Sequence, residues 1–114
     1  MILILSKPPY GSEDVISMLF IALAAVSRGI KTTIILIDDG VYTALRDQRP
    51  EGLKYPSVED LIYLIITDAE IFVHEDSLKE RGISGEDLIE GVNVSSDDEI
   101  VEVLLTKTGA FLLC

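Results

Sequence analysis

The sequence contains one cysteine, one histidine and no tryptophan, and only 9 of its 114 residues are lysine or arginine. A single cysteine excludes an intrachain disulfide and a cysteine-rich zinc site, and it is consistent with a reducing cytoplasm, where we expect the protein to be found. The 20 acidic residues give a net charge of −11. A surface so acidic repels phosphate backbones, so we expect no direct contact with nucleic acid.

The sequence also lacks a long hydrophobic run. Its longest apolar stretch, Val15–Val26, is interrupted by Ser17 and is too short to span a bilayer. The run Ile2–Leu5 has the length of a strand and lacks the basic segment that opens a signal peptide. We therefore expect a soluble protein that makes no contact with a membrane.

Hydrophobic residues make up 48% of the chain and aromatic residues 6%. This composition predicts an aliphatic core, and the length suits a single domain spanning residues 1–114. The sequence shows no repeat, low-complexity tract or interdomain linker.

The first 42 residues have the pattern of one complete βαβ unit. Ile2–Leu5 is a short apolar strand, and Thr32–Ile37 is a second strand with β-branched residues at most positions. Between them, Ser12 is the expected N-cap of a helix, with acidic residues in its first turn, and Gly29 ends that helix.

The same alternation continues to the end of the chain. Further strands are expected at Ala69–Val73, Val92–Val94 and Ala110–Leu113. Helices are expected at Val58–Thr67, capped by Ser57, at Ser77–Arg81, and after a cap at Ser95 or Ser96. Strands that alternate with helices predict an α/β fold, a three-layer α/β/α sandwich around a five-stranded, mainly parallel sheet.

Several motifs resemble the DsrE/DsrF-like family, especially its TusC/DsrF branch, and they follow one another in order along nearly the whole chain. They are Pro9-Tyr10-Gly11-Ser12-Glu13-Asp14, Asp39-Gly40-Val41-Tyr42, Asp47-Gln48-Arg49-Pro50, Ser77-Leu78-Lys79-Glu80-Arg81-Gly82-Ile83 and the terminal Phe111-Leu112-Leu113.

The resemblance implies the strand order 4-3-2-1-5 and a role in a sulfur relay, either in tRNA thiolation or in sulfur oxidation. It also implies a homo-oligomer, a trimer or hexamer, or assembly with related subunits. Apolar residues on the Val58–Thr67 helix exceed what one packed face needs, which favours association as well. Catalytic members of the family carry a cysteine just before the short helix that ends in Arg-Gly, and this chain has His74 there.

His74 directly follows the third strand, so it is expected at the carboxyl edge of the sheet, where α/β folds place their sites. The candidate cleft at this edge consists of His74, Glu75, Ser77, Asp39, Tyr10 and Ser12. No metal ligand set and no cofactor is predicted. Imidazole cannot carry a sulfane sulfur, but it can act as an acid or base or bind a ligand.

Cys114 is the one residue of the sequence that could carry sulfur. Its thiol lies beside the α-carboxylate, which disfavours the thiolate form. We therefore predict a non-catalytic or scaffold subunit of a sulfur-relay assembly. Two alternatives remain open: a small-ligand or metal-binding protein that uses the acidic sheet edge near Asp39 and His74, and a sulfurtransferase that acts through Cys114.

Overall fold

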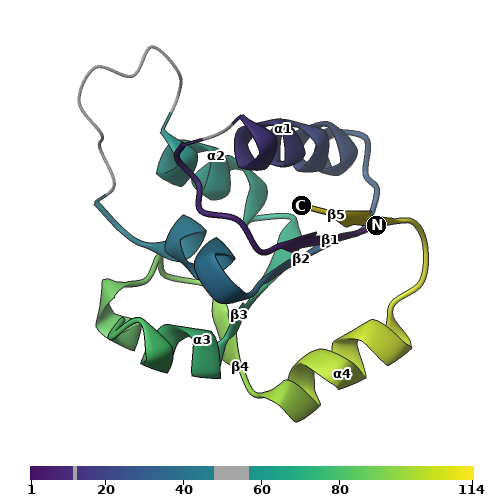
Figure 1. The fold of residues 1–114 in the computed structure, drawn as a ribbon. Coiled ribbons are helices and arrows are strands. Elements are labelled where there is room, and N and C mark those ends of the chain that lie inside the picture. Colours follow the sequence, from purple (N-terminus) through teal and green to yellow (C-terminus); the bar gives the residue numbers. More distant parts are fainter. Residues whose placement is uncertain (12, 48–56) are drawn as a thin grey trace.

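Five parallel strands form one sheet in the order β4-β3-β2-β1-β5 (Figure 1) in the computed structural model, which describes residues 1–11, 13–47 and 57–114. The strands are β1 (Ile2–Leu5), β2 (Thr32–Leu36), β3 (Ala69–His74), β4 (Asn93–Ser95) and β5 (Phe111–Leu113). The predicted fold class and the predicted strand order are both confirmed.

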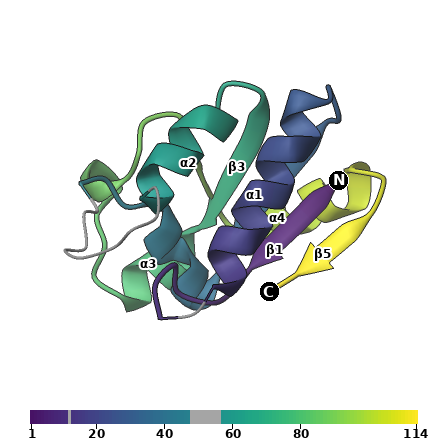
Figure 2. The same cartoon turned by 90° about the horizontal axis from the view of Figure 1, so that it is seen from above.

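Helices cover both faces of this sheet. They are α1 (Asp14–Ser27), α2 (Val58–Ile65), α3 (Glu75–Glu80) and α4 (Asp97–Thr106), with 3₁₀ helices η1 (Asp38–Ala44) and η2 (Gly85–Asp87). In Figure 2, which looks down on the sheet, α1 and α2 lie in front of the strands and α4 lies behind them, so the helices are on opposite faces. In the described residues no helix is both long enough and apolar enough to cross a membrane.

The aliphatic core is split between the two faces because side chains alternate along each strand. Leu3 and Leu5 of β1 pack toward α1 and α2, whereas Ile2 packs toward Ile100 of α4 on the opposite face. The α1–α2 side holds most of the buried core. The α4 side is thinner, and Leu113 of β5 leaves 74% of its surface exposed there.

Local sequence signals placed the starts of α2 and α4 correctly. Ser57 caps α2 by accepting a hydrogen bond from the Asp60 N–H, and Ser96 caps α4 in the same way. The cap predicted at Ser12 is wrong, since α1 starts at Asp14 with Glu13 as its N-cap, and Ser12 itself lies outside the described residues.

Other predicted boundaries shift by one or two residues. β2 ends at Leu36, β3 runs on to His74, β4 begins at Asn93, and β5 begins at Phe111. The helix predicted to start at Ser77 begins two residues earlier, and the one predicted to reach Thr67 ends at Ile65. The strand ends are set by pairing with neighbouring strands, which a single segment does not reveal.

The turn after β2 bends sharply over the carboxyl end of β1. Asp38 opens η1 with φ at 49°, a left-handed conformation that aspartate tolerates better than most residues. Two residues later Gly40 packs so closely on β1 that a Cβ there would lie 1.9 Å from the Leu5 carbonyl oxygen. This close approach holds the start of η1 beside the carboxyl ends of the strands.

Candidate functional site

His74 ends β3 at the carboxyl edge of the sheet and occupies the N-cap position of α3. Its backbone is extended there, with φ −66° and ψ 119°, so the side chain leaves the strand before the helix begins. The side chain is 20% exposed. The imidazole is thus held among neighbours while one edge still reaches the surface.

Both ring nitrogens of His74 have partners. Nδ1 lies 2.7 Å from the Oγ of Ser77, one turn into α3, and Nε2 lies 2.5 Å from Oδ1 of Asp97. Ser77 is 2% exposed, and its Oγ also accepts a hydrogen bond of 2.9 Å from the N–H of Asp38. The hydroxyl can either donate to Nδ1 or accept from it, so this buried group fixes the plane of the ring in either protonation state of His74.

Asp97 is a contact that the sequence analysis missed. It is the first residue of α4, and acidic residues at that position are sufficiently explained by the helix dipole. The missed signal is topological. Because β4 lies next to β3, with Ser95 opposite His74, the start of α4 must emerge close to the histidine.

Asp39 and Glu75, the two acidic residues of the predicted cleft, each form an ion pair. Asp39 accepts a hydrogen bond of 3.0 Å from Arg81 Nε, and another guanidinium nitrogen of Arg81 donates to the Ser77 carbonyl at 3.1 Å. The Asp39 carboxylate raises the pKa of Arg81. Glu75 pairs with Lys79 one turn along α3, at 2.9 Å. Asp39 is therefore connected to His74 only indirectly, through Arg81 and Ser77.

Tyr10 follows the carboxyl end of β1, but the hydrogen bond of its side chain is with α2 and not with the His74 group. Its hydroxyl accepts a hydrogen bond of 3.2 Å from the N–H of Val58, at the start of α2, and its ring packs against the core. This role is structural, because the hydroxyl satisfies one of the free N–H groups of that helix. Ser12, the sixth residue of the predicted cleft, lies outside the described residues.

Cys114 lies at the same edge of the sheet but three strands away from β3. Three strand spacings amount to about 14 Å, so the thiol does not reach the His74 network. Its N–H donates to the Ile4 carbonyl, and its own carbonyl accepts from the Ser6 N–H and hydroxyl. Burial and the nearby Asp14 carboxylate raise the pKa of the thiol, against a smaller opposing effect of Lys7.

Asp97, His74 and Ser77 are linked by hydrogen bonds in the arrangement of carboxylate, imidazole and hydroxyl that activates the serine of a catalytic triad. Ser77 cannot act in that way on an external substrate. It is almost fully buried, and its oxygen already accepts the Asp38 N–H. The hydroxyl positions the histidine, and the reactive edge of this group is Nε2.

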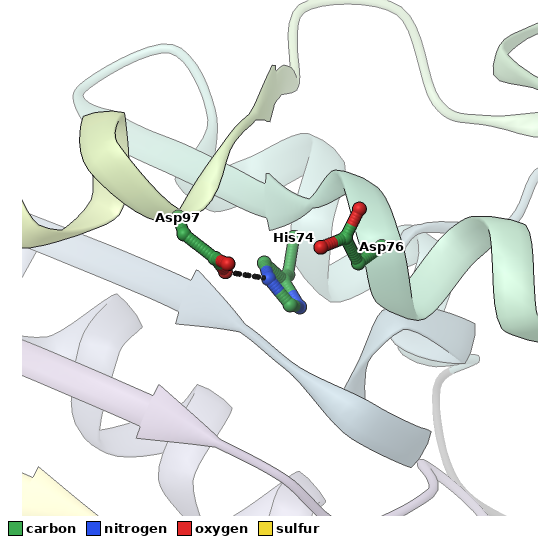
Figure 3. A group of neighbouring side chains, drawn as sticks. All are labelled: His74, Asp76 and Asp97. Atoms are coloured by element: carbon green, nitrogen blue, oxygen red, sulfur yellow. Dashed lines mark hydrogen bonds and ion pairs between the residues drawn. The ribbon is translucent and has the colours of Figure 1, made fainter.

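A third donor group faces the same edge. One ligand atom each of His74, Asp76 and Asp97 lies within 4.8 Å of the others, and Figure 3 shows both carboxylates turned toward the imidazole. Both aspartates are exposed.

A groove of about 660 Å³ lies at the amino ends of the strands and is lined in part by Met1, Glu70 and Lys107. None of the cleft residues lines it, and the histidine cluster lies at the opposite, carboxyl edge of the sheet.

Comparisons of the sequence and of the fold with known proteins point to the same family. The chain is 30% identical over 106 residues to the intracellular sulfur oxidation protein DsrF of Allochromatium vinosum, covering 86% of this chain and 77% of DsrF. It is 32% identical over 98 residues to the TusC homolog of Vibrio parahaemolyticus, covering 84% and 83% of the two chains.

The fold gives the same result. The crystal structure of the ychN protein from E. coli superimposes with a TM-score of 0.86 at 26% identity, over 99% of this chain and 97% of that one. The sequence model of the DsrE/DsrF-like family matches residues 1–109, almost the whole chain. The predicted resemblance is confirmed, and the chain belongs to the DsrE/DsrF-like family.

Proposed function

We propose that this chain is a subunit of a sulfur-relay assembly and that it does not itself carry the sulfur. The observation behind this proposal is the combination of its relatives with the residue at position 74. The relatives include a protein named for intracellular sulfur oxidation and a TusC homolog. At the position where the family resemblance calls for a cysteine, this chain has His74, and an imidazole cannot form a persulfide.

The surroundings of His74 also argue against sulfur transfer at this position. Ser77 and Asp97 hold the two ring nitrogens, so the side chain is oriented from both sides. A sulfur carrier needs the opposite, an accessible thiolate that moves its cargo to a partner. The site at the end of β3 keeps the family's place in the fold while its chemistry is changed.

Cys114 is poorly suited to take over the carrier role. A raised pKa lowers the fraction of thiolate near neutral pH, and the thiolate is the form that attacks a sulfur donor. Three backbone-directed hydrogen bonds to Ile4 and Ser6 tie the residue to β1. In the described residues it has no histidine beside it, since His74 is three strands away.

Exposed apolar side chains support the assembly part of the proposal. Leu105 of α4 is 80% exposed and Leu113 of β5 is 74% exposed, on the thinly covered face of the sheet. Leu64 of α2 is 59% exposed on the other side. We propose that copies of this chain associate through such surfaces, as the trimer or hexamer that the family resemblance implies, or with related subunits.

The test of the carrier question uses purified chain and a small persulfide donor, followed by intact mass spectrometry. The proposal predicts that wild-type protein gains no stoichiometric sulfur and that Cys114→Ser gives the same spectrum. The same variant should keep the oligomeric mass of the wild type in light scattering. Rapid and stoichiometric loading of Cys114, with transfer to an acceptor thiol, would replace this proposal by a sulfurtransferase function.

A further inference from the structure

We propose that His74, Asp76 and Asp97 form a binding site for a divalent transition-metal ion, with Zn²⁺ as its simplest occupant. The three residues come from three segments: the end of β3, the first turn of α3 and the first turn of α4. The fold thus brings one imidazole nitrogen and two carboxylates together, a mixed nitrogen and oxygen donor set.

The distances are close to what such an ion requires. Zn²⁺ binds histidine nitrogen and carboxylate oxygen at about 2.0–2.2 Å, which in a tetrahedral site separates two ligand atoms by about 3.4 Å. The three donor atoms here lie within 4.8 Å of one another. His74 Nε2 and Asp97 Oδ1 are 2.5 Å apart, a hydrogen-bond distance. An ion would take the place of this hydrogen bond, and the 73% exposed Asp97 side chain is free to move back by the small distance needed.

The other side of the imidazole already has the hydrogen bond typical of a metal-ligating histidine. Such residues donate their second ring N–H to an oxygen atom, which fixes the tautomer and the ring orientation. For His74 that oxygen is Ser77 Oγ, which is buried and itself held by the Asp38 N–H. This arrangement holds Nε2 at Asp97, and the Asp76 carboxylate is also turned toward the ring.

The local charges favour a cation despite the two helix N-termini at the site. The N-termini of α3 and α4 each carry about half a positive charge, and the two carboxylates of the site outweigh their sum. The nearby cations Lys79 and Arg81 are engaged by Glu75 and Asp39. Asp76 has no hydrogen bond or ion pair with the other residues that the structure describes. The overall charge of −11 further raises the local concentration of cations.

The donor set also selects among metals. Ca²⁺ takes six to eight oxygen ligands and Mg²⁺ needs near-octahedral oxygen coordination, whereas imidazole suits Zn²⁺ and similar ions. Three protein ligands leave at least one position open toward solvent. That position could hold water or a ligand atom from a bound molecule.

His74 is the single histidine of the chain, so its ring protons give the one set of histidine signals in an NMR spectrum of tag-free protein. Adding Zn²⁺ should shift these signals, and calorimetry should give one ion per chain. His74→Gln and Asp97→Asn should each weaken binding at least about tenfold, the lower bound seen for changes around metal ligands. Asp98→Asn is the matched control, because it removes the same charge one residue further along α4, and it should bind within about twofold of the wild type.

Circular dichroism is used to check that each variant is folded. If His74→Gln does not fold, Asp76→Asn and Asp97→Asn decide the question, since both side chains are exposed. Equal weakening by Asp98→Asn, unshifted His74 signals, or Mg²⁺ binding as tight as Zn²⁺ binding would each overturn the assignment. No sulfur donor is present in this experiment, so its outcome is independent of the sulfur-relay proposal.

Discussion

Replacing Gly40 by alanine would place a methyl group against the backbone of β1. The added Cβ would lie 1.9 Å from the Leu5 carbonyl oxygen and 2.6 Å from its carbonyl carbon, whereas real Cβ contacts stay above 3.0 Å. The turn would therefore have to retreat by more than 1 Å, judged from those two distances. Because the obstacle is strand backbone and not a flexible side chain, no local rotation relieves the clash.

The expected cost follows from two opposing effects. Overpacking of a well-packed site costs about 1–3 kcal/mol and occasionally more, and a backbone obstacle puts Gly40→Ala at the upper end. Alanine also restricts the unfolded chain, which returns about 0.4–1 kcal/mol. We therefore expect a net loss of at least about 2 kcal/mol in the free energy of unfolding.

Urea unfolding followed by circular dichroism measures this loss, and Gly85→Ala is the matched control. A Cβ at Gly85 meets nothing within 4 Å, so this variant should be as stable as the wild type or slightly more stable. In Gly40→Ala the His74 ring signals should also shift, because η1 supplies the Asp38 N–H to Ser77. Equal stability of the two variants would refute the packing argument.

Three further predictions concern the thiol, the buried hydroxyl and the apolar surface. Cys114 should react with iodoacetamide near pH 8 more slowly than a free cysteine, because burial and the Asp14 carboxylate raise the pKa of the thiol. Asp14→Asn removes that carboxylate and should therefore speed the reaction. A slower reaction of this variant would contradict the prediction. Ser77→Ala should lower the free energy of unfolding by about 1–3 kcal/mol, measured in urea, since the Asp38 N–H loses its acceptor. Leu105→Ser should change the free energy of unfolding by less than about 0.5 kcal/mol, because this side chain is 80% exposed. The same variant should lower the oligomeric mass measured by light scattering. An unchanged mass would exclude the surface around Leu105 from the subunit interface.

Local signals predicted much of the fold because they act over a few residues. Ser57 and Ser96 cap helices through their own side chains, and Ile2–Leu5 has the apolar run of a buried strand. The lysine at position 79 lies four residues after Glu75, a spacing that already predicts their ion pair. The strand order came from the family resemblance, since nothing in the spacing of the strands specifies it.

The site was less predictable because its contacts join segments that are distant in sequence. His74 and Asp97 are 23 residues apart and meet only because β4 pairs with β3. Arg81 reaches Asp39 across 42 residues in a similar way. Tyr10 follows β1 at the same edge of the sheet, and its hydroxyl accepts a hydrogen bond from the start of α2, a contact across 48 residues. Sequence patterns showed which edge of the sheet each residue occupies, and the folded chain showed which neighbours it has there.

We propose that position 74 is the family's sulfur-carrying position and that its histidine makes this chain a non-carrier. The most direct measurement compares wild-type protein with a His74→Cys, Cys114→Ser double variant after treatment with a persulfide donor, using intact mass spectrometry. We expect the double variant to gain one sulfur atom and the wild type to gain none. Stoichiometric sulfur on wild-type Cys114, with none on the cysteine introduced at position 74, would contradict it.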